Sequence, residues 1–178
     1  MIREESSQQV SRFISHWEEW GFGLWAVEEK GSGAFIGRIG LMVHDDWPEG
    51  EHKTEVGWML ARPFWGRGLA TEGALASVGY GFEELGLERI ISITLPGNTA
   101  SRRVMGKVGL TYRGSTCWRD HDVVWYAADR REWGTGGAYL ACEFPRTPYM
   151  RSSQNPITRT SSNSLWSQSY RVGIPQQQ

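Results

Sequence analysis

The chain has 178 residues and carries 19 Lys and Arg against 20 Asp and Glu, so its formal net charge at pH 7 is −1. This length suits one compact domain, and a nucleic-acid partner is not expected because phosphate binding needs an excess of clustered basic residues. No apolar run approaches the roughly 20 residues that span a bilayer, and the N-terminus lacks the basic start and apolar stretch of a signal peptide. We therefore expect a cytoplasmic protein with no membrane and no nucleic-acid partner.

Residues 1–133 alternate between helical and strand-like apolar patterns. In chain order the sequence predicts a helix at 4–20, strands at 22–28, 34–43 and 54–60, a helix at 69–85, a strand at 89–95, a helix at 98–107, and strands at 110–115 and 122–128. The turn-forming Lys30, Gly31, Ser32 and Gly33 join the first two strands into a hairpin. The strand, helix and strand between residues 54 and 95 have the length of a parallel crossover. The expected class is a mixed α/β fold.

The composition changes after Trp133. Residues 134–178 hold four Arg and a single acid and are rich in Ser, Thr, Gln and Pro. Such a segment buries too little surface to offset its chain entropy. We expect one domain at 1–133 and a low-complexity, mostly disordered tail at 134–178, with a docking role for Leu165, Trp166 and Tyr170 as the alternative.

A glycine-containing loop, RPFWGRGLATE at residues 62–72, separates the strand at 54–60 from the next helix. Gly66 and Gly68 allow consecutive backbone N–H groups to converge, and the helix N-terminus adds partial positive charge, so the loop can hold a pyrophosphate. The loop lacks the Gly-Lys-Ser/Thr of an NTP-binding loop, and Glu72 stands where a dinucleotide motif has its third glycine. A plain turn before a helix is the alternative.

The segments EVGWMLARPFWGRGLATEGA and ITLPGNTASRRVMGKVGL resemble the GNAT superfamily of acetyl-CoA-dependent N-acetyltransferases. The superfamily's pyrophosphate motif is matched by residues 65–70, and Trp65 at its first position is typical of the branch that includes ribosomal-protein N-terminal acetyltransferases. The resemblance runs from residue 4 to residue 133. It implies a mixed, mostly antiparallel twisted sheet flanked by helices, around a parallel β-α-β core that binds acetyl-CoA.

The resemblance also implies which residues bind acetyl-CoA. The backbone of Met59, Leu60 and Ala61 is expected to contact the thioester and the pantetheine. The residues expected around the pyrophosphate are Trp65, Gly66, Arg67, Gly68, Leu69, Ala70 and Thr71. Those expected at the coenzyme on the second conserved helix are Asn98, Ser101 and Arg102. Helix capping by Asn98 and Ser101 and a solvated face for the arginines are the alternatives.

Acetyl transfer requires a neutral amine, and because a lysine-like amine has a pKa near 10.4, a base is needed. Glu55, on the strand before the loop, is the candidate base, with a solvated strand Glu as the alternative. Ser101 and Tyr112 are the candidates to protonate the leaving thiolate. The predicted reaction is direct attack by a primary amine in a ternary complex, the amine belonging to a protein N-terminus, an aminoglycoside-like drug or a polyamine. A non-catalytic acyl-CoA-binding or interaction module is the alternative.

No metal is expected. The ligand-type residues His44, Asp45 and Asp46 are adjacent in the chain and have no third site that converges with them. The two cysteines, Cys117 and Cys142, are too few for a disulfide framework and are expected to be free thiols.

Members of the family normally have a strand and a helix ahead of the helix that here starts near residue 4. The resemblance places that strand at one end of the sheet and that helix beside the acceptor pocket, so we expect a bare sheet edge and an open substrate site. Three explanations for the missing strand and helix stay open: a fragmentary gene, a domain-swapped homodimer, and replacement of the strand by the tail.

Overall fold

The computed structural model describes residues 3–133 and 170–173. Its elements are, in chain order, helix α1 (Arg3–Trp20), strands β1 (Leu24–Glu29), β2 (Phe35–Val43) and β3 (Thr54–Leu60), a short 3₁₀ helix η1 (Arg62–Phe64), helix α2 (Leu69–Glu83), strand β4 (Arg89–Thr94), helix α3 (Thr99–Lys107), and strands β5 (Thr111–Trp118), β6 (His121–Asp129) and β7 (Tyr170–Gly173). The helices and strands predicted up to residue 133 are confirmed, each within a few residues of its predicted ends.

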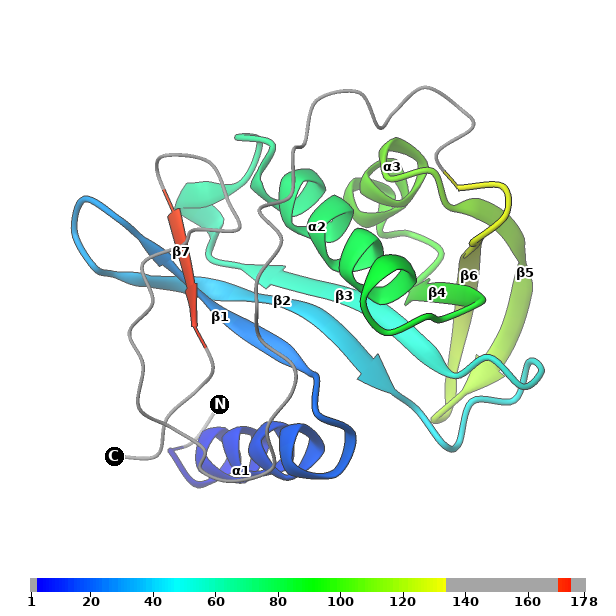
Figure 1. Cartoon of the computed structure of the whole chain (residues 1–178), viewed down its shortest axis with the longest axis horizontal. Helices are drawn as coiled ribbons and strands as arrows, with labels where there is room; N and C mark the ends of the chain where they lie inside the picture. The colour runs from blue at the N-terminus through cyan, green and yellow to red at the C-terminus, as the bar shows by residue number, and fades with distance from the viewer. Residues whose placement is uncertain (1–2, 134–169, 174–178) are drawn as a thin grey trace.

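The strands form one seven-stranded sheet in the order β5-β6-β4-β3-β2-β1-β7. All neighbouring pairs run antiparallel except β3 and β4, which are parallel and are connected through α2. In Figure 1, α2 and α3 lie above the sheet and α1 lies below it, and we call these two sides the upper and lower faces. The expected mixed α/β class, with a mostly antiparallel sheet around one parallel β-α-β unit, is confirmed.

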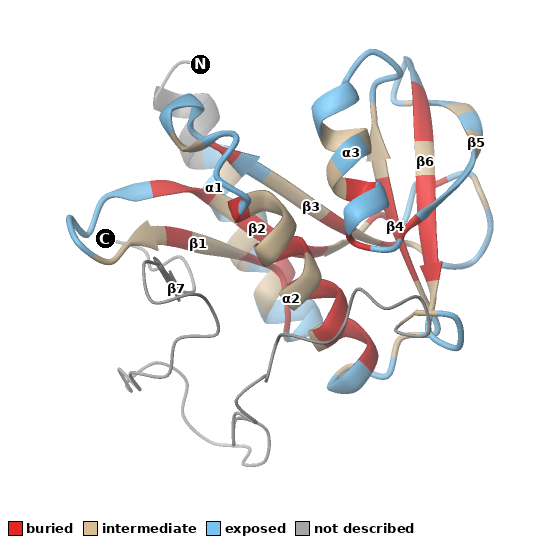
Figure 2. Ribbon diagram, turned by 90° about the horizontal axis from the view of Figure 1, so that it is seen from above, coloured by how far each residue is buried: buried red, intermediate tan, exposed pale blue. Residues whose placement is uncertain are grey.

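Apolar side chains divide between the two faces because successive side chains of a strand point in opposite directions. The larger core lies under α2 and α3 and includes Val56 of β3, Phe82 of α2 and Met105 of α3. A smaller cluster on the lower face joins Trp47 and Ile91 to two residues of β6. Figure 2 shows buried residues along β4, β6 and the inner side of α2, which places the main core between the helices and the sheet.

Strand β3 has the two faces that its sequence predicts. Val56 and Leu60 are buried toward α2, whereas Glu55, Gly57 and Met59 face the lower side. On that side α1 contacts β2, and the Trp47 cluster covers β4 and β6. The lower face of β3 therefore lies between two covered regions of the sheet.

Helix α1 is attached to the sheet through the buried ring of His16. Its Nδ1 lies 2.9 Å from the carbonyl oxygen of Phe22, and its Nε2 lies 2.9 Å from the backbone nitrogen of Val43. Since a carbonyl only accepts and a backbone N–H only donates, Nδ1 carries the hydrogen and Nε2 accepts, so the ring is neutral. Burial lowers the pKa of His16, which keeps this tautomer in place.

The β5–β6 hairpin is longer than predicted, because β5 continues to Trp118. Its turn residues Arg119 and Asp120 have φ of 49° and 61°. This left-handed region disfavours residues with a Cβ, and Asn or Gly usually occupies it in two-residue hairpins. An Arg-Asp pair gives no such turn signal, so the sequence pattern ended the strand too early.

Strand β7 differs from the expectation of a tail without structure. Tyr170–Gly173 pair antiparallel with β1, with Val172 opposite Val27 and Arg171 opposite Glu28. The edge of the sheet that was expected to be bare is thus paired along β1, and replacement of a strand by the tail is the alternative that matches. The rest of the predicted tail, 134–169 and 174–178, and with it Leu165, Trp166 and Cys142, lies outside the described residues.

The His16 bonds predict a pH-dependent stability. The unfolded ring takes a proton near its ordinary pKa of about 6.5, whereas the folded ring resists it until lower pH, so stability is full above that pH and falls below it. The free energy of unfolding of His16→Leu should be about 1–3 kcal/mol lower than that of the parent, because a buried N–H and a buried carbonyl lose their partners. It should also lose most of the melting-temperature difference between about pH 7.5 and about pH 5.5. Thermal melts at both pH values check this, with the exposed His52→Gln as control, and an undiminished pH dependence in His16→Leu would contradict it.

The pairing of β7 predicts a specific effect of Val172→Pro. Proline cannot donate to the ladder and disfavours a paired strand, so β1 should become an unpaired edge that promotes association. Hydrogen exchange should accelerate at the amides of residues 26–29 and larger species should appear in light scattering, while Val172→Thr leaves both unchanged. Unaltered exchange over residues 26–29 in the proline variant would show that β7 does not hold this edge.

Candidate active site

Strands β3 and β4 pair at one register position only, Glu55 opposite Ile91. Beyond it, side chains supply the bonds that a backbone ladder would make. Ser92 Oγ donates to the carbonyl oxygen of Val56 at 2.9 Å, and the N–H of Ile93 donates to Glu55 Oε1 at 3.2 Å. We call the unpaired stretch beyond Glu55 and Ile91 the ladder opening, and these two bonds mark its closed end.

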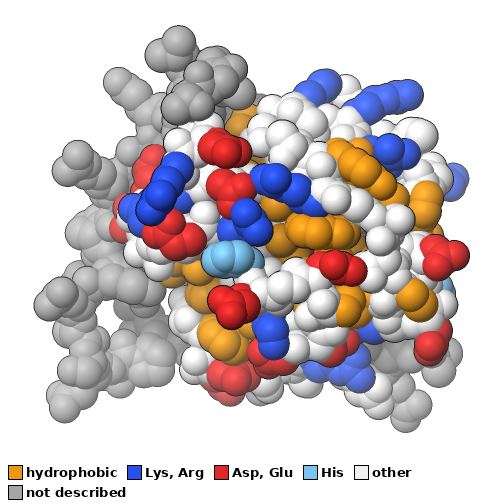
Figure 3. Space-filling view, turned by 90° about the vertical axis from the view of Figure 1, so that its right-hand side faces the viewer, with side chains coloured by type: hydrophobic (Ala, Val, Ile, Leu, Met, Phe, Trp, Pro, Cys, Tyr) orange, Lys and Arg blue, Asp and Glu red, His pale blue; other side chains and the backbone are white. Residues whose placement is uncertain are grey.

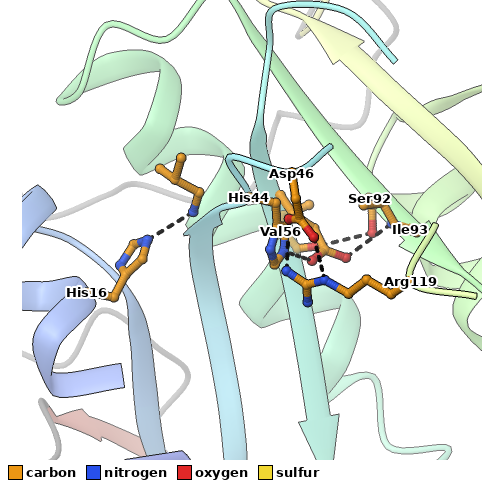
Figure 4. Close-up of polar contacts among 9 residues, drawn as sticks. His16, His44, Asp46, Val56, Ser92, Ile93 and Arg119 are labelled. Atoms are coloured by element: carbon orange, nitrogen blue, oxygen red, sulfur yellow. Dashed lines mark hydrogen bonds and ion pairs between the residues drawn. The ribbon is translucent and has the colours of Figure 1, made fainter. Parts of the chain in front are cut away.

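Glu55 is bound on both carboxylate oxygens. While Oε1 accepts from Ile93, Oε2 lies 2.6 Å from Nε2 of His44, and the two side chains keep 18% and 10% exposure. Because an ionised carboxylate only accepts hydrogen bonds, Nε2 donates the hydrogen in this pair. The alternative of a solvated strand Glu does not match this environment. Figure 4 shows His44 beside the start of β3, close to Ser92 and Ile93 of β4.

The His44 ring packs against a cluster of tryptophan rings. Trp118 meets it edge-on with ring centroids 4.9 Å apart, and Trp47 meets Trp118 in the same way at 5.5 Å. Trp47 also contacts Trp125 at 5.8 Å and is 3% exposed. Aromatic pairs prefer this geometry, so the tryptophans pack the lower-face cluster and fix the orientation of His44.

The β5–β6 turn is tied to the loop that follows His44. The Nε and a terminal nitrogen of Arg119 donate to the two carboxylate oxygens of Asp46 at 2.8 and 2.9 Å, and the guanidinium carbon lies 4.1 Å from the Trp118 ring centroid. Figure 4 shows this pair next to His44. The Arg119 hydrogen bond is the main reason that the pKa of Asp46 is lowered. These contacts offset the unfavourable φ of Arg119 and hold Trp118 against His44.

Gly57 leaves space beside the Glu55 carboxylate on the lower face. A Cβ at Gly57 would have only Glu55 within 4 Å, at 3.9 Å from Cδ and 4.0 Å from Oε2. Apart from the two chain neighbours of Gly57, no other described side chain or backbone group comes that close. A single carbon atom at this position would make ordinary contacts next to the oxygen that His44 binds.

The loop after β3 contains two glycines with left-handed backbone conformations. Gly66 and Gly68 have φ of 74° and 83°, and apart from their chain neighbours no heavy atom of the described residues lies within 4 Å of the position of a Cβ at either. Gly68 is the N-cap of α2 and, because it has no side chain, makes no side-chain capping bond to the helix. Trp65 is 60% exposed and its Nε1 donates to the carbonyl oxygen of Leu60 at 2.6 Å, which fixes the end of β3 against the loop. The guanidinium of Arg67 lies over the ring of Phe64 at 5.4 Å.

The residues predicted on α3 already bond within the protein. Asn98 caps the helix by accepting from the backbone N–H of Ser101 at 3.1 Å, as the alternative prediction has it. Arg102 donates to the Tyr126 hydroxyl at 3.1 Å and to the carbonyl oxygen of Pro96 at 3.2 Å, so its guanidinium is not simply a solvated charge. Helix α3 holds three basic residues and no acid, and Figure 3 shows basic side chains along the upper edge, the side on which α3 lies.

The predicted catalytic residues lie on opposite faces of the sheet. Glu55 faces the lower side, whereas Tyr112, 54% exposed, stacks edge-on against Tyr126 of the upper core with centroids 5.5 Å apart. Ser101, at the start of α3, is also on the upper side. A ligand that passes through the ladder opening is therefore the element that would connect the predicted base to the predicted acids.

Sequence reasoning did not identify His44 as the partner of the candidate base Glu55. His44 was considered only as a metal ligand, and among the described residues no group of three His, Cys, Asp or Glu gathers around a metal position. The usable signal was the hairpin register, since Met42 pairs with Glu55 and His44 is two residues further on the same face. Such diagonal neighbours are within reach of long side chains.

Residues 2–111 match the family model of the acetyltransferase (GNAT) domain. The chain therefore belongs to the GNAT acetyltransferase family, which uses acetyl-CoA. No helix in the described part of the chain is both long and apolar enough to cross a membrane.

The chain is also similar to individual curated proteins and solved structures. The chain is 39% identical over 115 residues to the uncharacterized protein YkkB of Bacillus subtilis, covering 60% of this chain and 66% of that protein. It is 36% identical over 129 residues to the FsC-acetyl coenzyme A-N(2)-transacetylase of Aspergillus fumigatus, covering 64% and 52%. The crystal structure of ribosomal-protein-S5-alanine acetyltransferase from Vibrio fischeri shares the fold, with a TM-score of 0.60, 18% identity and 73% of each chain covered. The chain thus spans between about half and two thirds of the length of these curated relatives.

Proposed function

We infer that the protein is an acetyl-CoA-dependent N-acetyltransferase that moves the acetyl group to a primary amine by direct attack in a ternary complex. One observation carries the inference. The parallel ladder opens between the phosphate-type loop at the end of β3 and the Glu55–His44 pair at its closed end. A long ligand with a phosphate group at one end and a thioester at the other has the shape that such an opening accepts.

The residues present fit acetyl-CoA. The open positions of Gly66 and Gly68 and the N-terminus of α2, through Leu69, Ala70 and Thr71, would bind the pyrophosphate. Backbone groups of Met59 and Ala61 would meet the pantetheine, whereas the Leu60 carbonyl oxygen already accepts from Trp65. Arg102 would reach a phosphate only by exchanging its bonds to Tyr126 and Pro96.

The chemistry of the site follows from its charges. Acetyl-CoA supplies an acetyl thioester, and the Glu55–His44 pair provides the group that removes a proton from the attacking amine. The space beside Gly57 holds the reacting atoms close to that pair. On the upper side, Ser101 or Tyr112 would donate the proton that the departing thiolate takes up.

Two classes of acceptor amine are proposed. One relative is named for N(2) acetylation of FsC and a structural neighbour for acetylation of an alanine of ribosomal protein S5. Both a small-molecule amine and a protein N-terminus are therefore kept as proposed acceptors. A cytoplasmic location and a homodimer are parts of the same proposal.

The loop can be tested with a matched pair of glycine variants. Gly68→Ala should weaken acetyl-CoA binding at least about tenfold in calorimetry, because a Cβ forces the backbone away from positive φ and turns the N–H groups. Gly86→Ala is the control, since Gly86 has φ +69° and equally open surroundings but lies beyond the other end of α2. It should lose similar stability and keep the affinity of the parent, for which a dissociation constant on the order of micromolar is expected.

The outcomes separate the two functional classes. Acetyl-CoA binding with CoA release in the presence of an alanine-starting peptide, spermidine or an aminoglycoside supports the transferase. Binding without turnover on any acceptor favours the non-catalytic acyl-CoA-binding module. Equal binding of ATP, or equal effects of the two alanine variants, would contradict the loop as an acetyl-CoA site.

A further inference from the structure

The Glu55 carboxylate is poorly placed to be the base by itself. Both of its oxygens already accept hydrogen bonds, one from the backbone of Ile93 and one from His44. The Ile93 bond also closes the end of the ladder opening, so moving this carboxylate toward a substrate would disturb the pairing of β3 and β4. These features suit a Glu55 carboxylate that positions the His44 ring.

His44 has a feature that Glu55 lacks, a ring nitrogen with no hydrogen-bond partner among the described residues. Nε2 is committed to Glu55, and Nδ1 makes no hydrogen bond to any residue that the structure describes. With the hydrogen on Nε2, the neutral ring leaves its lone pair on Nδ1. The side chain is nine-tenths buried, and its ring is fixed by the edge contact with Trp118.

When a buried carboxylate accepts a hydrogen bond from one nitrogen of an imidazole, the other nitrogen can act as a base. The carboxylate selects the tautomer, orients the ring and stabilises the imidazolium that forms, without taking the proton itself. An imidazole, with an ordinary pKa near 6.5, is matched to proton removal at neutral pH. Trp118, Asp46 and Arg119 add a rigid support behind the ring.

We propose that His44 is the general base of the acetyl transfer and that Glu55 is its positioning residue. This assignment rests on the proposed function and gives the two residues of the Glu55–His44 pair different roles. The ammonium form of the acceptor gives one N–H proton to Nδ1, directly or through one water, and the nitrogen lone pair forms the new N–C bond to the acetyl carbon. The nitrogen then gives up a second proton as the C–S bond breaks with its electron pair on sulfur. Sulfur takes up one proton to leave as the CoA thiol, and the imidazolium releases the other proton to solvent.

The charges around His44 come from several elements. Glu55 of β3 is in direct contact, Asp46 and Arg119 form a compensated pair beside it, and His16 of α1 lies near enough for its charge and that of His44 to interact. His16 in turn is near Glu19 and Asp45. Glu55 is the only one of these that bonds the ring within the described residues. It therefore stabilises the imidazolium more than any other neighbour.

The test compares His44→Gln, Glu55→Gln and His44→Ala in steady-state assays with acetyl-CoA and the acceptor that the parent uses best. Glutamine at position 44 can still donate a hydrogen bond to Glu55 but cannot accept a proton at neutral pH. His44→Gln should therefore lose at least about 100-fold in kcat with acetyl-CoA affinity unchanged, and the rise of kcat/KM with pH seen in the parent should disappear. His52→Gln, in the same loop and exposed, should behave as the parent.

Chemical rescue separates a base from a structural part. Added imidazole should restore turnover to His44→Ala, at a rate that increases with the pKa of a series of methylimidazoles. Glu55→Gln should keep the acidic limb of the pH profile at a shifted position, because the base is still present.

The results that overturn the proposal differ from those that overturn the proposed function. If the parent turns over and His44→Gln keeps its kcat and pH profile, His44 is not the base, although the transferase stands. If the parent turns over no acceptor at all, both are withdrawn. Nitrogen NMR of the His44 ring gives a readout without turnover: hydrogen on Nε2 with a bare Nδ1 supports the proposal, and the opposite tautomer overturns it.

Discussion

The ladder between β3 and β4 stops after a single register pair, and the site depends on this interruption. Glu55 and Ser92 close the end of the opening with side-chain bonds, so the sheet keeps its order without filling the space beyond. A continuous parallel ladder would leave backbone groups paired and no room for a ligand. Because Glu55 makes one of the closing bonds, the group that shapes the opening is also the group that holds His44.

Stability at the lower face comes from elements distant in sequence. Trp47 and Trp118 pack against each other across the loop after β2 and the β5–β6 hairpin, and Arg119 binds Asp46 across the same junction. The unfavourable φ of Arg119 is tolerated because these contacts act together. Strain near a candidate active site is consistent with a turn selected for position and not for local preference.

Much of the fold was predictable because its signals are local. The periods of α1, α2 and the strands, and the glycines of the loop, decided the class and located Glu55, Gly66 and Gly68. The Glu55–His44 contact was not predicted, because it depends on the register of a hairpin and on a tryptophan from another hairpin. Strand β7 was missed for a related reason: four residues pair with β1 through backbone bonds, for which composition carries no signal. Local patterns locate elements, whereas contacts between distant elements require the folded chain.

The central claim is that the acetyl group sits at the closed end of the ladder opening, beside Gly57 and the Glu55–His44 pair. Proton NMR of the protein with a ketone analogue of acetyl-CoA, in which a methylene group replaces the sulfur, tests it directly. The account predicts nuclear Overhauser effects from the terminal methyl group to the Gly57 Hα atoms and the His44 ring. Effects confined to Tyr112 and Tyr126 on the upper face, with none to Gly57 or His44, would contradict it.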